Sequence, residues 1–136
     1  YNWYAVDDAR GLCPSGWHVP TDSEYMTLEM ELGMSYTDAN EVTACTTNCP
    51  QRGTDQGTQM KDVSFSGTNT RGFSGLAGGY RDYGGGFYDK GNDGSFWSAS
   101  ASGTGAWYRS LLGALTEVYR DSYGQRSGFS VRCVRD

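Results

Sequence analysis

Residues that commonly carry catalysis are scarce in this chain, which has a single histidine, His18. A Ser-His-Asp or Cys-His arrangement would have to be built around that imidazole. The apolar context Trp17-His18-Val19 is more typical of a packed framework imidazole that satisfies a buried polar group than of a catalytic base. No set of acid, base and nucleophile can be assembled from the pattern, so the sequence does not favour an enzyme.

Four cysteines offer a second kind of chemistry, and their even number suits an oxidising compartment. Among the three pairings that they allow, we favour Cys13 with Cys133 and Cys45 with Cys49. The longer bridge closes a loop of about 120 residues, which the chain-entropy model expects to stabilise the fold by about 4 to 5 kcal/mol. Zinc is the alternative, but Cys45-x-x-x-Cys49 is not the usual knuckle spacing.

An acidic turn is the candidate for metal binding. The run Asp89-Lys-Gly-Asn-Asp-Gly94 resembles the start of a calcium loop, yet Gly91 occupies a ligand position and Ser100 stands where an EF-hand has glutamate. Turn formation explains the run more simply, so we expect no cofactor. The alternative left open is a lectin-type calcium site built from Asp89, Asn92 and Asp93.

Aromatic residues are abundant, with ten Tyr, four Trp and five Phe, and each belongs either to the core or to a contact surface. We place Trp97 and Trp107 in the core. Five tyrosines instead lie among Gly, Asp and Ser, a mixture typical of antibody binding loops. These candidates for ligand contact are Tyr83, Tyr88, Tyr108, Tyr119 and Tyr123.

Strand alternation extends this candidate set. In residues 107–112, Trp107, Arg109 and Leu111 fall on one face of a strand, which leaves the residues between them on the other face. The run 112–115 would add an apolar patch of the kind that marks contact sites. The predicted ligand-binding residues are Tyr83, Tyr88, Tyr108, Ser110, Leu112, Leu115, Glu117, Tyr119, Asp121, Tyr123 and Gln125.

The elements that must position these residues begin near the N-terminus. Residues 2–6 are rich in strand formers and predict a strand. Thr21 and Glu24 form a capping-box pattern that predicts a helix over 22–32, ended by Gly33. Tyr25, Leu28 and Leu32 recur on one side of that helix and should pack onto a sheet.

The remainder of the chain is rich in loops. Residues 35–58 are polar and follow neither a strand nor a helix period, so we expect a long loop pinned by its own disulfide. Later apolar runs separated by glycine predict a small antiparallel sheet and hence an α+β domain. These predicted strands are 73–80, 87–88, 96–97, 106–112, 118–119 and 129–134.

Length and charge narrow the choice of partners. The 136 residues fit a single domain, 1–136, which we read as excised from a longer secreted or surface chain because it opens without an initiator Met. A net charge of −5 with no basic cluster argues against nucleic acid. No apolar run approaches the roughly 20 residues that would insert in a membrane.

Several motifs, in order along nearly the whole chain, resemble the Fibrobacter succinogenes major paralogous domain, with the main departure in 37–58. They are Tyr1–Val6, Gly11–Pro20, Gly72–Leu76, Gly78–Arg81, Phe96–Ser98, Ala106–Arg109 and Gly128–Cys133. The resemblance implies a C-type-lectin-like fold. Formylglycine-generating enzymes share that fold class, but their reactive cysteine pair has no counterpart here once Cys13 and Cys133 close the fold.

The resemblance also implies a function. The family includes extracellular bacterial proteins and targets of diversity-generating retroelements, some encoded by phage, in which Asn codons in a C-terminal stretch are diversified. Between Arg109 and Gly128, Leu111, Val118 and Arg120 look like framework, and most residues between them can be reached from an Asn codon. We therefore expect a ligand-binding or adhesion domain with a variable C-terminal surface.

Such a domain would bind a protein or glycan ligand on another cell or surface, and would itself be extracellular, on the cell surface or on a virion. The alternative is a structural or carbohydrate-related accessory domain of a secreted bacterial protein, without an activity of its own.

Overall fold

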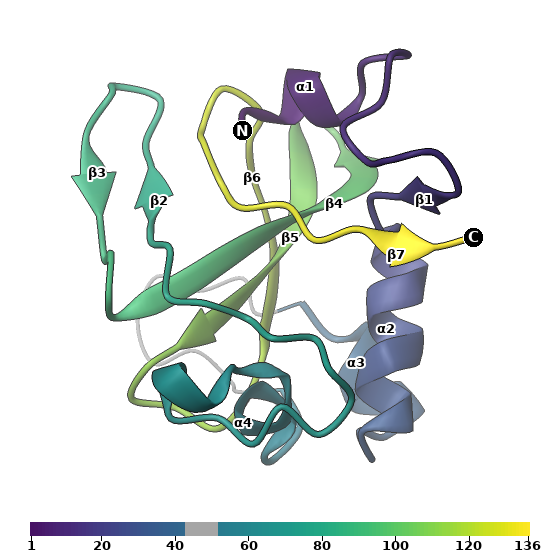
Figure 1. Ribbon diagram of the computed structural model, residues 1–136, viewed down its shortest axis with the longest axis vertical. Helices are drawn as coiled ribbons and strands as arrows, with labels where there is room; N and C mark the ends of the chain where they lie inside the picture. The colour runs from purple at the N-terminus through teal and green to yellow at the C-terminus, as the bar shows by residue number, and fades with distance from the viewer. Residues whose placement is uncertain (43–51) are drawn as a thin grey trace.

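The computed structural model describes residues 1–42 and 52–136 and confirms the predicted α+β fold (Figure 1). Its helices are α1 (Trp3–Val6), α2 (Asp22–Glu31), α3 (Tyr36–Asn40) and α4 (Gln56–Met60), with a 3₁₀ helix, η1, at Val63–Phe65. Its strands are β1 (Trp17–His18), β2 (Tyr80–Arg81), β3 (Phe87–Tyr88), β4 (Asp93–Ser102), β5 (Gly105–Leu112), β6 (Tyr119–Gly124) and β7 (Val134–Arg135).

The main sheet pairs β4, β5 and β6 antiparallel in chain order, while β2 pairs with β3 and β1 with β7. Residues opposite one another in adjacent strands point to the same side of a sheet. The register therefore divides the main sheet into two faces. Phe96, Arg109 and Arg120 lie opposite one another on the helix face. The tyrosine face carries Ser95, Trp97, Tyr108, Ser110, Leu112, Tyr119, Asp121 and Tyr123.

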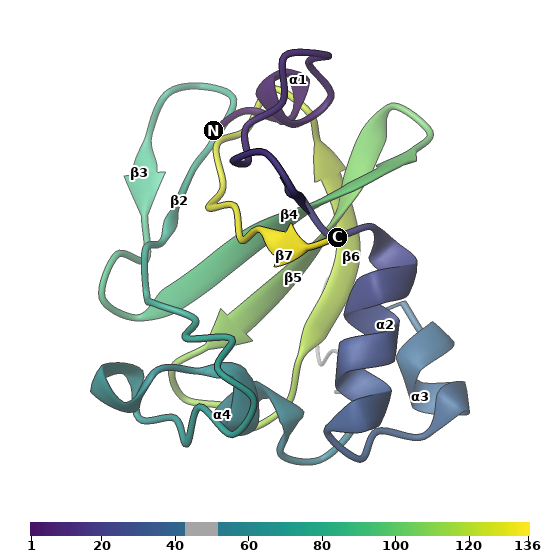
Figure 2. The same ribbon diagram turned by 45° about the vertical axis from the view of Figure 1, so that its right-hand side comes forward.

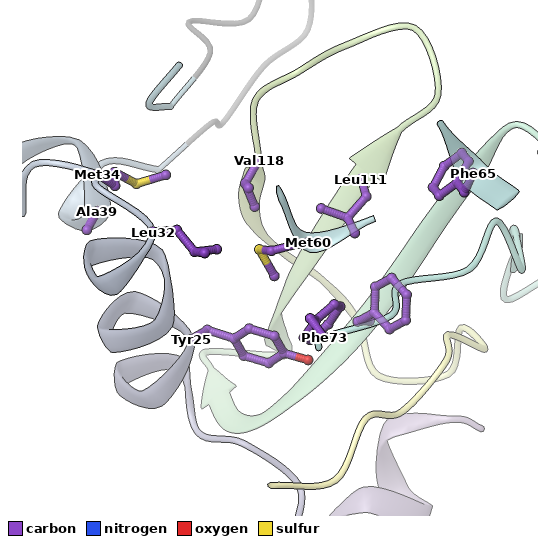
Figure 3. Packing of buried hydrophobic residues seen from close by; sticks show 10 residues of the cluster. Tyr25, Leu32, Met34, Ala39, Met60, Phe65, Phe73, Leu111 and Val118 are labelled. Atoms are coloured by element: carbon purple, nitrogen blue, oxygen red, sulfur yellow. The ribbon is translucent and has the colours of Figure 1, made fainter. Parts of the chain in front are cut away.

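Helix α2 packs on the helix face, as predicted. Its capping box forms, with the Glu24 amide donating to the Thr21 hydroxyl and the Thr21 amide donating to the Glu24 carboxylate. Gly33 takes a φ of +96° after the helix, a conformation that glycine adopts without strain. Tyr25 and Leu32 are buried with Leu111, Val118 and Phe73 (Figure 3), which fixes α2 against the sheet.

The same side of α2 also buries two carboxylates. Asp22 and Glu29 form what we call the buried ion network with Arg52, Arg109 and Arg120. Arg109 lies between the two, 2.7 Å from Asp22 and 2.5 Å from Glu29, while Arg52 pairs with Glu29 and Arg120 with Asp22, each at 2.6 Å. Burial raises the pKa of Asp22, but its hydrogen bonds to Arg120 and Arg109 outweigh that effect and lower it.

This network contains three guanidinium groups but only two carboxylates. Backbone carbonyls accept further hydrogen bonds from the guanidinium groups. Arg52 donates to the Ala39 carbonyl at 2.8 Å and Arg120 to the Asn40 carbonyl at 2.9 Å, both at the end of α3. Carbonyls at a helix end have no partner within the helix. The network thereby ties α2, α3, β5 and β6 together.

A smaller core covers one end of the tyrosine face. It buries Trp3, Trp97, Ala106 and Phe129, with the Trp97 and Phe129 rings stacked at 4.1 Å. The C-terminal segment joins β4 through hydrogen bonds from Trp97 to Ser130 and from Ser130 to Ser95. The predicted Cys13–Cys133 disulfide is confirmed and links the beginning of the chain to this segment. Close to this bridge, β1 and β7 lie side by side (Figures 1 and 2).

The predicted N-terminal strand over 2–6 is wrong, because residues 3–6 form α1. Asn2 caps this turn by accepting a hydrogen bond from the Ala5 amide at 3.1 Å. Trp3 is anchored through its indole N–H, which donates to the Ser98 carbonyl at 2.9 Å. Of the two aromatic residues that favour a strand here, Trp3 fills the smaller core and Tyr4 is exposed.

The uniform loop predicted over 35–58 is also wrong, since α3 lies within it and α4 begins in it. Its Cys45–Cys49 bridge falls outside the described residues. The predicted strands 73–80 and 129–134 form regular pairing only at their ends, in β2 and β7. The rest of each segment makes isolated parallel bridges to β4, Gly79 to Gly94 and Phe96 to Ser130.

Candidate ligand-binding face

A pocket of about 240 Å³ opens on the tyrosine face. Three strands of the main sheet supply its base, and two segments outside them close its sides. The base consists of Ser95, Tyr108, Ser110, Leu112, Tyr119 and Tyr123. Asp93, the first residue of β4, lies at the edge of the base, and the sides consist of Tyr80, Asp89 and Phe129. Five of the predicted ligand-binding residues therefore meet in one hollow.

Alternation along β5 and β6 positions these five residues. Arg109, Leu111 and Arg120 are buried on the helix face, and Val118, just before β6, is buried with them. Since neighbouring residues in a strand point to opposite sides, the intervening side chains are directed to the tyrosine face. The buried ion network fixes Arg109 and Arg120, and so fixes the strands from which the pocket residues project.

The tyrosines of the pocket are supported by ring contacts. Tyr108 lies 4.9 Å from Phe129 and 6.1 Å from Tyr123, and Tyr123 lies 6.4 Å from Tyr80. Tyr88 stacks on the outer side of Tyr80 at 5.4 Å. Tyr80, Tyr108 and Tyr123 thus each have at least one aromatic neighbour that limits rotation of the ring, so these three side chains have little conformational freedom to lose on binding.

The electrostatic character of the pocket is neutral to acidic. Burial raises the pKa of Tyr108, and nearby Asp121 and Tyr123 raise it further. Burial likewise raises the pKa of Tyr80, with smaller effects of Tyr123 and Asp89. Both phenols stay protonated at neutral pH and can donate as well as accept hydrogen bonds. Within the described residues, neither hydroxyl has a hydrogen-bond partner.

The loop beside the pocket, residues 112–118, is held by a residue that sequence reasoning missed. Lys61 extends its ammonium group to the carbonyls of Leu112 and Leu115, at 2.5 Å from each. Burial lowers the pKa of Lys61, while nearby Asp93 and Glu117 raise it in part. In the predicted apolar patch over 112–115, Leu112 and Leu115 are half-buried, whereas Gly113 and Ala114 are exposed.

The other predicted contact residues surround the pocket without lining it. Tyr83 is 68% exposed in the turn between β2 and β3, and Asp121 lies on β6 opposite Tyr108. Leu115 and Glu117 are half-buried in the loop before β6, and Gln125 donates to the Gly105 carbonyl at 3.0 Å. Trp107, predicted in the core, is half-buried on the helix face under the Arg120 guanidinium, 4.2 Å from its ring centroid.

The acidic turn lies at the rim of the pocket. Asp89 has a φ of +57°, and its carbonyl accepts from the amides of Asn92 and Asp93, both at 2.9 Å, so the run forms the predicted turn. Asp93 also accepts from the Gly113 amide at 3.1 Å. In the described part of the chain, no three His, Cys, Asp or Glu side chains are grouped to hold a metal ion. The two carboxylates instead add acceptors to the pocket.

His18 is not the buried imidazole that its apolar neighbours predict. It is partly exposed at the β1–β7 pair, with Nδ1 2.6 Å from Asp136 and Nε2 2.8 Å from Glu24. Those hydrogen bonds, the one to Asp136 first, raise the pKa of His18. His18 lies on β1, a two-residue strand paired only with β7. The apolar residues next to His18 in the sequence therefore do not cover its imidazole.

Tyr80 and Phe129 were not among the predicted contact residues, and only the packing of their segments across β4 brings them to the pocket. In the sequence, the feature that could have indicated the position of Tyr80 is the pair of glycines before it. A Cβ on Gly79 would stand 2.2 Å from the Tyr88 carbonyl, so glycine is required for β2 and β3 to approach each other and present Tyr80.

Comparison with known proteins gives a family but no close relative. No curated protein and no solved structure matches the chain. No helix among residues 1–42 and 52–136 is long and apolar enough to cross a membrane. The model of the Fibrobacter succinogenes major domain matches residues 1–135, which covers every motif on which the resemblance was based. The chain is therefore a member of the Fibrobacter succinogenes major domain family.

Proposed function

We propose that this domain is a ligand-binding module that uses the pocket of the tyrosine face to attach to a protein or glycan on another surface. The observation that carries the proposal is the division of β5 and β6 into two sets. Arg109, Leu111 and Arg120 are committed to the fold, whereas Tyr108, Tyr119 and Tyr123 meet around an open hollow.

The composition of the pocket supports binding in place of catalysis. Tyrosine rings offer flat apolar area, and their hydroxyls add hydrogen bonds. Asp89 and Asp93 contribute carboxylate acceptors at the rim. Sugar hydroxyls and protein side chains that donate hydrogen bonds both match this lining.

We further propose that the tyrosine face is a surface diversified by a retroelement on a C-type-lectin-like scaffold, and that the domain is displayed outside the cell or on a virion. The proposal fits the alternation, because Tyr108, Ser110, Leu112, Tyr119 and Asp121 can each arise from an Asn codon by adenine substitution, while the framework residues between them are buried. A neighbouring reverse transcriptase gene and a near-copy of the 3′ coding sequence that differs at adenines would support diversification, and their absence would remove it.

Binding is tested by a variant that combines Tyr108→Phe, Tyr119→Ala and Tyr123→Phe. Tyr108 and Tyr123 are changed only to Phe because both rings pack on Phe129. We expect binding to glycan arrays or whole bacterial cells to weaken by about tenfold or more, with the Tm changed by less than about 4 °C. Tyr36→Ala, at a 72% exposed tyrosine on α3, is the matched control and should bind normally.

Equal binding by the variant and the parent domain would contradict the proposed face. If the parent domain binds none of these targets, the accessory-domain alternative, without an independent ligand, is favoured instead.

A further inference from the structure

A second pocket, of about 410 Å³, lies between α2 and the C-terminal segment and shares no lining residue with the pocket on the tyrosine face. In Figures 1 and 2, β7 lies beside the beginning of α2, and residues of both elements line this pocket. Its volume falls within the range of pockets that bind small molecules.

The floor of this pocket is apolar. Leu28 of α2, Phe73 and Val134 of β7 contribute aliphatic and aromatic area, and Trp17 adds an indole that remains 46% exposed. A half-exposed tryptophan beside other apolar side chains leaves hydrophobic surface in contact with water. Covering that surface with an apolar group would be favourable.

The rim is cationic. Arg71, Arg132 and Arg135 line the pocket from two separate segments, and all three are exposed. In the part of the chain that the structure describes, no hydrogen-bond or ion-pair partner is found for their guanidinium groups. Glu24, a carboxylate in the lining, is already engaged with His18 and Thr21. Three unpaired guanidiniums around one hollow are notable in a protein with a net charge of −5.

We propose that this pocket, which we call the arginine groove, binds a small amphipathic anion. An aromatic or aliphatic body would lie on Trp17 and Leu28, and a carboxylate or sulfonate would accept hydrogen bonds from the arginines. Guanidinium groups suit this role because their planar array of donors matches such oxyanions.

The probe is 2-naphthalenesulfonate, and 2-naphthalenemethanol is its neutral counterpart. Titration of the labelled domain should shift the NMR signals of the Trp17 indole and of residues 132–135, while the signals of Tyr108 and Tyr123 stay in place. The double variant Arg71→Gln, Arg132→Gln should weaken binding of the sulfonate by about tenfold. Arg126→Gln, at an exposed arginine outside the groove, removes the same type of charge and should leave affinity unchanged.

Three results would overturn the proposal. The first is equal affinity for the neutral alcohol, which would reduce the groove to a hydrophobic hollow. The second is equal weakening by Arg126→Gln, which would indicate general electrostatic attraction. The third is an absence of shifts at Trp17. None of these results concerns the tyrosine face, so the experiment tests the arginine groove independently of the proposed function.

Discussion

Glu29 accepts hydrogen bonds from both Arg52 and Arg109 while its side chain is fully buried. Removing its charge would leave two guanidiniums in the interior without the negative charge that they share, and a broken buried pair typically destabilises a protein by about 3 to 5 kcal/mol. We therefore expect Glu29→Gln to lower the free energy of unfolding by roughly that amount, measured by urea denaturation.

Glu31→Gln is the control for this substitution, since Glu31 lies on the same helix but is exposed. It should change stability by less than about 0.5 kcal/mol. A similarly small effect of Glu29→Gln would show that the buried ion network contributes little to folding. The sequence does not reveal this role, because Asp22 and Glu29 look like ordinary polar positions on an amphipathic helix.

Among the elements, the β1–β7 pair holds the chain's one titratable imidazole between Asp136 and Glu24. A pKa raised by folding means that stabilisation is present below the unfolded value near 6.5 and is lost as pH rises through the folded value. The contribution of His18 to the free energy of unfolding should therefore decrease from pH 6 to pH 8. Comparing the pH dependence of the parent domain with that of His18→Gln isolates the effect, and parallel curves would contradict it.

A helix or strand could be predicted from the sequence where the residues that determine it are close together in the chain. Helix α2 was predictable because Thr21, Glu24 and Gly33 act within the helix or next to it. Helix α1 was not, because Trp3 is placed by Ser98, far along the chain. Alternation in β5 located Tyr108, Ser110 and Leu112 correctly on one face. Tyr80 and Lys61 reach the site only through packing between distant segments, which no local pattern contains.

At the scale of the whole molecule, the Cys13–Cys133 disulfide joins residues 120 positions apart. Replacing both cysteines with serine removes a constraint on the unfolded chain, so we expect the free energy of unfolding to fall by about 4 to 5 kcal/mol. Urea denaturation of the double variant under non-reducing conditions measures this loss while leaving Cys45 and Cys49 unchanged. A loss below about 1 kcal/mol would indicate that the packing of the C-terminal segment on β4 closes the fold without the bridge.

The buried ion network also governs how the sheet can assemble. Sliding β6 by one residue along β5 would turn every side chain of β6 to the opposite face. Arg120 would then leave Asp22, and Asp121 or Tyr119 would take its place, depending on the direction of the slip. A misaligned sheet would thus leave the buried Asp22 carboxylate without one of its two guanidinium partners, as well as being poorly packed. The network therefore favours the one register of β6 in which Arg120 faces Asp22.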